Sequence, residues 1–162
     1  MLRIIGVKDP WGNMESVAHR VGLGIPDLRG AFTRAAQRRH AAAHEAGADT
    51  QPVDLQNYTR EALAIAISFD LLMSRANCLL QYGRVPEYED FRSQASLNLR
   101  LRFLDKSRNK WREVPEGRRR AYRVKETLQD LRLESASRAR ANGEAIVIRD
   151  EAGVPQDWLS LP

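Results

Sequence analysis

The chain of 162 residues contains a single cysteine, Cys78, which excludes an internal disulfide and any metal site built from several thiolates. It also lacks a run of about 18 apolar residues, so we expect no membrane-spanning helix. The first residues, MLRIIGVKDPWG, have no basic start followed by a long apolar stretch and a small-residue cleavage site, so they do not look like a secretory signal. These absences favour the reducing cytosol, and we predict a cytoplasmic location.

Acidic residues are scarce in one part of the chain. Residues 97–142 hold 14 Lys or Arg against 6 Asp or Glu, a local net charge of +8, whereas the whole chain has a net charge of +5. Most of these cations are arginines, which can bind a phosphate through two parallel hydrogen bonds. This asymmetry favours a polyanionic partner, most simply a nucleic acid. The alternative is an ordinary solvated basic surface.

The apolar patterns predict an α+β fold with a helical domain at residues 1–83, a linker at 84–95 and a small basic unit at 96–162. Residues 3–7 (RIIGV) can form a short strand. Asn13 is a suitable cap for a short helix that ends at Val21. A second helix is expected over about 27–46, with Gly47 closing it.

A polar loop at 47–57 is then followed by a helix over about 59–82, for which Thr59 is the expected cap. Its apolar residues occur on nearly all sides, so we expect it to be buried on all sides. The preceding helices are too few and too short to cover it. Either the rest of the chain or a second protomer must cover the remainder.

The last part of the chain is interpreted as a small ββαββ unit. Residues 96–104 (SLNLRLRFL) alternate polar and apolar side chains, which predicts a strand, and residues 110–114 (KWREV) can return as its partner. A helix is expected over 124–142, a strand over 144–150 (EAIVIRD) and a last strand near 158–161. A rival assignment makes residues 87–112 one long helix, against which the alternation of leucines argues.

The second predicted helix contains an unusual group of cationic and titratable side chains, in the segment QRRHAAAHEAGAD. Arg39 falls on the apolar stripe of this helix, which also contains Leu28, Phe32, Ala35, Ala42 and Ala46. A guanidinium on such a face needs a partner, because burying an unpaired charge is costly. His44 lies in the last turn, where the helix dipole favours the imidazolium form.

The segment Arg39-His40-Ala-Ala-Ala-His44 has the form Arg, polar residue, three residues, His, and resembles the signature of the HEPN superfamily. The context is similar too, because the motif ends one helix and a polar loop and a long apolar helix follow. The resemblance covers about residues 13–82. It implies an all-helical domain, here abbreviated, since HEPN domains usually have one or two long helices before the motif helix and only 26 residues precede this one.

The resemblance further implies metal-independent RNA cleavage that leaves 2′,3′-cyclic phosphate and 5′-hydroxyl ends, without a cofactor. The implied catalytic residues are Arg39, which would hold the scissile phosphate, His44 as general acid or base, and His40 at the polar position. The family carries its motif near a dimer interface, so we expect a homodimer through the motif helix and the 59–82 helix. Residues five apart on a helix point about 140° apart, which also favours a site shared by two chains.

A toxin or antiviral defence role, with a neutralising or regulatory protein partner, is a further expectation from the resemblance. In toxins silenced by a partner nucleotidyltransferase, a tyrosine stands two residues after the motif histidine, where this chain has Ala46. Regulation by modification at that position is therefore not expected.

Three other interpretations of the motif stay open. His40 and His44 lie four residues apart and could bind zinc, although His19 and Cys78 lack metal-ligand spacing, so we predict no metal. The segment could be only a basic helix surface with His44 as a satisfied helix end. It could also belong to an inactive HEPN-type fold that serves as a nucleic-acid-binding or regulatory dimer.

The basic unit offers a second candidate surface for RNA. Residues 118–123 (RRRAYR) place four arginines around one tyrosine, and Trp111 could add an aromatic ring for base stacking. The alternative is that Trp111, Tyr122 and Trp158 are core aromatics. The residues predicted to bind RNA are Arg38, Arg118, Arg119, Arg120, Arg123 and Trp111.

Overall fold

The computed structural model describes residues 2–44 and 51–160, and within them it shows an α+β fold of five helices and one five-stranded sheet. Four helices come first and the strands follow, with one more helix inserted between them. In chain order the elements are α1 (Pro10–Val21), α2 (Leu28–His44), α3 (Pro52–Gln81), α4 (Val85–Ser93), β1 (Arg100–Ser107), β2 (Lys110–Pro115), β3 (Arg123–Lys125), α5 (Leu128–Asn142), β4 (Glu144–Arg149) and β5 (Pro155–Leu159).

The sheet has the strand order β3-β2-β1-β4-β5. β1 pairs in parallel with β4, and the other neighbours pair antiparallel. Successive side chains of a strand point to opposite faces, so Leu101 and Phe103 lie on one face and Arg102 and Leu104 on the other. All four are buried, which shows that both faces of β1 are covered. The predicted ββαββ order is present, with the three-residue strand β3 in addition.

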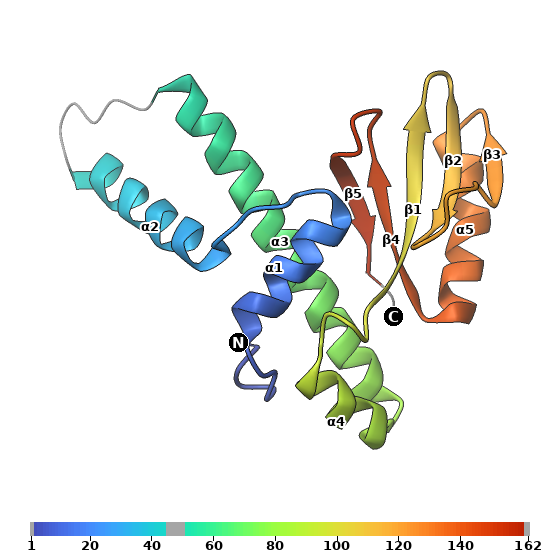
Figure 1. Ribbon diagram of the computed structural model, residues 1–162, viewed down its shortest axis with the longest axis horizontal. Helices are drawn as coiled ribbons and strands as arrows, with labels where there is room; N and C mark the ends of the chain where they lie inside the picture. The colour runs from blue at the N-terminus through green and yellow to red at the C-terminus, as the bar shows by residue number, and fades with distance from the viewer. Residues whose placement is uncertain (1, 45–50, 161–162) are drawn as a thin grey trace.

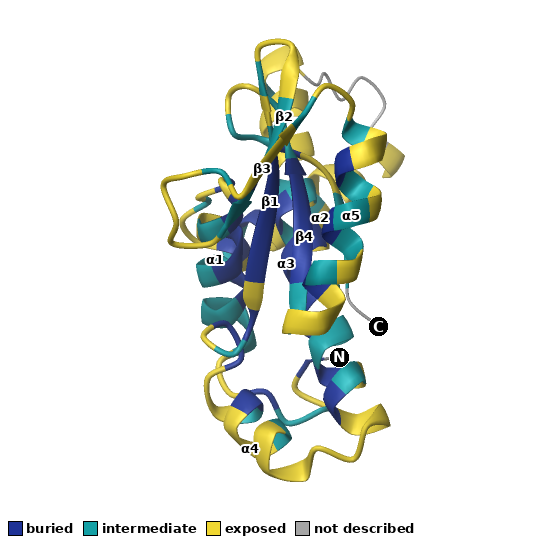
Figure 2. Ribbon diagram, turned by 90° about the vertical axis from the view of Figure 1, so that its right-hand side faces the viewer, coloured by how far each residue is buried: buried dark blue, intermediate teal, exposed yellow. Residues whose placement is uncertain are grey.

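The molecule has three layers, with the sheet between α5 on one face and α1 and α3 on the other (Figure 1). One hydrophobic cluster joins α1 and α3 to Leu101, Phe103 and Val147 of the sheet. A smaller cluster joins α5 to Leu104 and Ile146 on the opposite face. Figure 2 shows β1 and β4 as the buried centre of the sheet. The main core therefore runs across the boundary that the sequence predicts between a helical domain and a basic unit.

Polar contacts also join the helices to the sheet. Arg20 of α1 donates to the backbone carbonyls of Ser96 and Leu99 and forms an ion pair with Glu116 at 2.7 Å. On α3, the Asp70 carboxylate accepts from the Trp158 indole at 2.8 Å and from the Ser160 hydroxyl at 2.9 Å. These bonds fix α1 and α3 against opposite parts of the C-terminal unit.

The N-terminal part differs from the sequence prediction in two places. Residues 3–7 form turns rather than a strand, with Gly6 at φ 75°, a conformation that suits glycine. Helix α1 begins at Pro10, and its cap is Asp9, whose carboxylate accepts from the backbone N–H of Gly12. Asn13, the predicted cap, instead accepts from the backbone N–H of Ser96 at 2.7 Å.

Helix α3 begins at Pro52 rather than near Thr59. The Thr59 hydroxyl donates to the backbone carbonyl of Leu55 one turn earlier, so Thr59 lies inside the helix. Proline suits the first turn of a helix because the backbone N–H that it lacks would have no partner there. The predicted helix end at Gly47 and the stripe position Ala46 lie outside the described residues.

The predicted linker at 84–95 contains helix α4. It begins next to Pro86, and its Phe91 side chain is fully buried in the main core. The backbone N–H of Lys8 also donates to the Arg92 carbonyl at 2.9 Å. This segment is therefore a packed part of the fold, and the prediction of a linker is corrected.

Helix α3 is the central helix of the structure. By length and composition it could cross a membrane, but the core helices of soluble proteins pass the same test. Its buried residues, from Ala64 to Leu79, pack in the main core. Within the described chain this helix is not covered on all sides, because Leu80 is half exposed, and its coverage by a second protomer stays a prediction.

Candidate functional site

The predicted catalytic residues lie on a helical arm that projects from the rest of the molecule. Helix α2 and the first half of α3 extend away from the sheet (Figure 1). Burial on α2 is confined to Leu28 and Ala31, and burial on α3 begins only at Ala64. The described residues of the arm beyond these points are exposed or partly exposed. The arm therefore offers its surface to solvent or to another molecule.

Arg39, His40 and His44 lie together near the end of α2. All three are exposed and line one shallow depression of about 280 Å³, together with Ala36 and Ala43. The imidazole rings of His40 and His44 stand 4.6 Å apart, one helical turn from each other. Arg39 and His44 of one chain therefore line the same depression, although residues five apart on a helix point about 140° apart.

This depression is open and is formed by α2 alone among the described residues. Arg39 forms no ion pair or side-chain hydrogen bond with any residue of 2–44 or 51–160. Two imidazoles and a guanidinium can contact a phosphate and donate or accept protons. The described residues would contact a phosphate on this surface from one side only.

Beyond the buried Leu28, the apolar stripe of α2 is only partly covered within the described chain. Phe32 is 53% exposed and its ring centre lies 5.8 Å from that of Trp11 on α1. An apolar depression of about 320 Å³ lies beside it, lined by Leu2, Arg3, Pro10, Trp11, Met14, Phe32, Ile65 and Phe69. The partly covered stripe and the motif therefore belong to the same projecting arm.

A second candidate surface lies at the other end of the molecule, between the 115–122 loop and the end of α5. It is a cavity of about 660 Å³ lined by Arg102, Pro115, Arg118, Arg119, Arg120, Ala121, Tyr122, Arg138 and Asn142. The Tyr122 ring is 60% exposed, and the Arg138 guanidinium lies 5.3 Å from its centre. Cationic side chains beside an exposed aromatic ring can bind a phosphate and stack a base.

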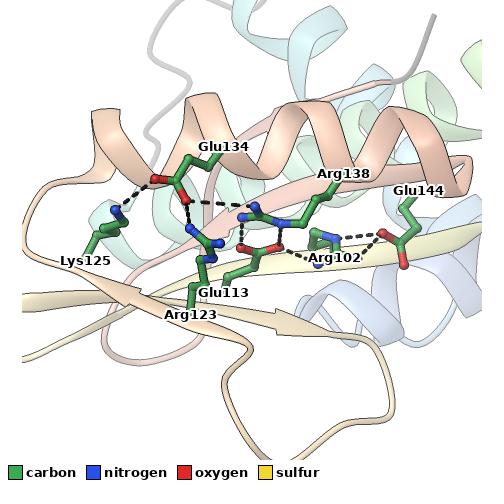
Figure 3. Close-up of polar contacts among 7 residues, drawn as sticks. All are labelled: Arg102, Glu113, Arg123, Lys125, Glu134, Arg138 and Glu144. Atoms are coloured by element: carbon green, nitrogen blue, oxygen red, sulfur yellow. Dashed lines mark hydrogen bonds and ion pairs between the residues drawn. The ribbon is translucent and has the colours of Figure 1, made fainter.

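Two of the lining residues, Arg102 and Arg138, belong to a buried ion-pair network (Figure 3). Glu113 of β2 is completely buried and accepts hydrogen bonds from Arg138 of α5 and Arg102 of β1. Arg102 also donates to Glu144 of β4, at 2.6 Å. Burial alone would raise the pKa of Glu113, but the hydrogen bonds from Arg138 and Arg102 outweigh it and hold this pKa below its ordinary value. The network therefore stays ionised near neutral pH.

A second carboxylate, Glu134 of α5, continues the network at the surface (Figure 3). It accepts from Lys125 at 2.8 Å and from Arg123, both on β3. Hydrogen bonding to Lys125 and the charge of Arg123 lower the pKa of Glu134. Arg102, Arg123 and Arg138 are thus neutralised by carboxylates.

In contrast, Arg118, Arg119 and Arg120 are exposed, and their side chains contact no carboxylate of the described chain. They supply the uncompensated positive charge of the cavity. Such charge favours an anionic ligand.

The structure brings some of the predicted RNA-binding residues together and separates others. Arg118, Arg119 and Arg120 share the cavity with Tyr122, whereas Arg123 is paired with Glu134. Trp111 does not line the cavity. It is partly buried and packs against the cluster that joins α5 to the sheet. Arg38 is exposed on α2 and lies outside the lining of the motif depression.

The sequence prediction did not identify Glu113 and Arg138 as residues at this cavity. Their contacts with Arg102 join β1, β2 and α5 across 11 and 25 positions of the chain, so no local motif reveals them. The alternation of residues 96–104 places Arg102 on the polar face of its strand, and the structure buries that face under α5.

Among the described residues, no group of three or more His, Cys, Asp or Glu side chains is placed to hold a metal ion. The chain matches no protein-family model, no curated protein and no solved structure.

Proposed function

We propose that the protein is a cytoplasmic, metal-independent endoribonuclease that acts as a homodimer, and that its helical part is an abbreviated member of the HEPN superfamily. The observation that carries this proposal is the joint exposure of Arg39, His40 and His44 in one depression on the projecting α2. Their side chains supply the positive charge and the proton donors and acceptors that cleavage through a ribose 2′-hydroxyl requires.

In this reaction the 2′-hydroxyl attacks the adjacent phosphate, the 2′-oxygen loses its proton, and the 5′-oxygen leaves with a proton. Arg39 would hold the phosphate oxygens and stabilise their developing negative charge. His44 would act as general acid or base, and His40, with its ring 4.6 Å away, would contact the phosphate or orient His44. The products are a 2′,3′-cyclic phosphate and a 5′-hydroxyl.

A second copy of the chain would complete the site. The motif depression is open on one chain, and a partner arm would enclose the phosphate. The exposed Phe32 and the apolar depression beside it, lined in part by Ile65 and Phe69 of α3, provide apolar area for this contact. The dimer would then use the motif helix and the 59–82 part of α3.

Arg118, Arg119 and Arg120 would hold the RNA backbone at the opposite end of each chain, with Tyr122 available for stacking. The resemblance extends the proposal to a toxin or antiviral defence effector with a neutralising protein partner.

The test is cleavage of labelled total RNA in EDTA by the wild type, Arg39→Ala and His44→Ala. Matched controls are Arg29→Ala, an exposed arginine at the start of α2, and His19→Ala, an exposed histidine on α1. We expect the wild type and both controls to leave cyclic-phosphate ends, and both motif variants to lose activity by at least about 100-fold. Equal activity of all five proteins would refute the assigned site.

A non-catalytic RNA-binding or regulatory dimer is the second candidate function. It is favoured by the separation of the two predicted surfaces, since α2 and the cavity beside α5 lie on opposite sides of the molecule (Figure 1). Under this alternative the wild type binds RNA without cutting it, and Arg39→Ala and His44→Ala bind as tightly as the wild type.

A further inference from the structure

A second arginine-lined cavity, of about 770 Å³, lies where the end of α3, the start of α4, the start of β1 and the end of α5 meet. Side chains from all four elements contribute to its walls. The lining residues are Arg75, Cys78, Tyr82, Arg84, Glu87, Arg100, Arg140, Ala141, Asn142 and Gly143. Neither the motif on α2 nor the residues predicted to bind RNA take part in it.

The cavity carries a strong excess of positive charge. Four arginines line it against one carboxylate, that of Glu87. Within the described chain, none of the side chains of Arg75, Arg84, Arg100 and Arg140 forms an ion pair or hydrogen bond. Arg102 and Arg138 beside the neighbouring cavity differ, because each is bound to buried or partly buried carboxylates. Four like charges around one hollow repel each other unless an anion lies between them.

Arg75 adds a second observation. It is partly buried on α3, and its Nε atom is buried without a hydrogen-bond partner. Its guanidinium lies against the end of α5, where a side-chain carbon built on Gly143 would stand 3.5 Å from Nη1. An unsatisfied buried donor costs stability, and a cationic group held this way is prepared for an anionic acceptor.

The helix ends explain only part of this arrangement. Arg140 lies in the last turn of α5, where the helix dipole favours a cation. Arg84 follows the end of α3, where the dipole also favours a cation, whereas Arg100 begins β1 and Arg75 lies within α3, so these two have no such role. Arginines from α3, the α3–α4 connection, β1 and α5 thus converge on one hollow for a reason beyond the helix dipole.

We propose that this cavity binds a ligand with two or more linked phosphate groups, such as a nucleoside triphosphate or the 5′-triphosphate end of an RNA. Its volume falls within the range of small-molecule sites. Arginine guanidinium groups fit phosphate oxygens, and the 65% exposed ring of Tyr82 offers a surface for a base. The cavity adjoins the one that contains Arg118–Arg120, since Asn142 lines both. This proposal is independent of the proposed ribonuclease site.

The only cysteine of the chain lines the cavity and reports on its occupancy. The first measurement is the alkylation rate of Cys78 with and without inorganic triphosphate, ATP, AMP and sulfate at matched ionic strength. We expect triphosphate and ATP to slow the reaction severalfold in a saturable way, and sulfate and AMP to act only at much higher concentration. Titration calorimetry with the same ligands gives the affinity without relying on the thiol.

Two variants locate the binding. Arg84→Ala and Arg100→Ala remove exposed arginines of the cavity and should weaken triphosphate binding by roughly tenfold or more each. Arg60→Ala, which removes an exposed arginine of α3 away from the cavity, should leave binding unchanged. The absence of calorimetric binding, or equal loss in all three variants, would overturn the proposal.

Two further ligands distinguish a free nucleotide from an RNA end as the source of the phosphates. A short RNA with a 5′-triphosphate is compared with the same RNA carrying a 5′-hydroxyl. Tighter binding of the triphosphate RNA than of ATP identifies an RNA end as the ligand, and the reverse order identifies a free nucleotide. If both RNAs bind equally and Arg84→Ala affects neither, the cavity does not recognise linked phosphates. Loss of RNA cleavage in the His44→Ala variant leaves all these results unaffected.

Discussion

At the scale of single residues, the least expected feature is a fully buried glutamate that is bound by two arginines. Glu113 lies on the face of β2 that packs against α5, and Arg102 and Arg138 approach it from different elements. A buried carboxylate is costly unless it is paired and hydrogen-bonded. Glu113 meets both conditions. It therefore fixes the position of α5 and, with it, the cavity that contains Arg118–Arg120.

We predict that Glu113→Gln destabilises the protein by about 3 kcal/mol, because it leaves two arginine charges without their shared counter-charge while keeping the shape of the side chain. Urea unfolding of both proteins measures the difference. The exposed Glu126→Gln variant is the control and should change the free energy of unfolding by less than about 0.5 kcal/mol. Equal stability of Glu113→Gln and wild type would show that the pairing contributes nothing net.

The same glutamate predicts a pH dependence. Its pKa in the folded protein lies below the ordinary value of 4.5, so the unfolded chain takes up a proton at a higher pH than the folded one. The stabilisation is therefore complete above about pH 4.5 and is lost as the pH falls through the lowered pKa. The stability difference between wild type and Glu113→Gln should be constant at neutral pH and shrink as the pH falls from about 4.5 to about 3. A difference that is constant over this range would contradict the assignment.

These residues also show where prediction from the sequence stops. The sequence predicts that Arg39 and His44 point about 140° apart on one helix, whereas the structure places both of them, with His40, at one depression on α2. The contacts of Glu113 depend on which strands are neighbours and on the position of α5, which only the folded chain defines. Pairing across 11 to 42 positions leaves no local pattern to recognise.

At the scale of elements, proline accounts for the main errors of prediction. Pro10, Pro52 and Pro86 stand in the first turns of α1, α3 and α4, where proline is favoured. The segments around Pro52 and Pro86 are predicted as loop and linker, whereas α3 begins about two turns before the predicted cap Thr59 and α4 lies within the predicted linker. The strands β1, β2 and β4 were predicted from their alternation and apolar content, whereas β3, with three residues, is too short to show a period.

Helix α4 provides the prediction at this scale. Phe91 is fully buried, so Phe91→Ala should destabilise the whole protein by about 3–5 kcal/mol through lost burial and a cavity. Val85→Ala on the same helix is the control, because Val85 is 62% exposed and should contribute less than about 0.5 kcal/mol. Thermal unfolding followed by circular dichroism compares the three proteins. A small effect of Phe91→Ala would indicate that α4 is loosely attached, as the linker prediction implied.

At the scale of the whole molecule, the cavity that contains Arg118–Arg120 and the catalytic candidates on α2 lie apart. The affinity for single-stranded RNA should fall with salt concentration, because each phosphate contact releases a counterion. Replacing Arg118, Arg119 and Arg120 together by alanine should reduce the slope of log affinity against log salt by about 2. Fluorescence anisotropy at several salt concentrations measures it. An unchanged slope would show that the RNA does not contact Arg118–Arg120. The variant that replaces Arg29, Arg38 and Arg60 together by alanine tests by the same measurement whether the RNA contacts the arm.

The arrangement of the arm raises the question of whether Arg39 acts with His44 of its own chain or with that of a second copy. The two residues line one depression on a single α2, yet that depression is open to solvent. Mixing Arg39→Ala with His44→Ala answers it, because a mixed dimer keeps one Arg39 and one His44, on different chains. If pairs form across the dimer, two inactive proteins should together recover about a quarter of wild-type cleavage, since half of the dimers are mixed and each retains one of two pairs. If pairs form within a chain, the mixture stays as inactive as its components.

Light scattering confirms that both variants are dimers. Phe32→Glu, which charges the partly covered stripe of α2, should abolish both the dimer and the recovered activity.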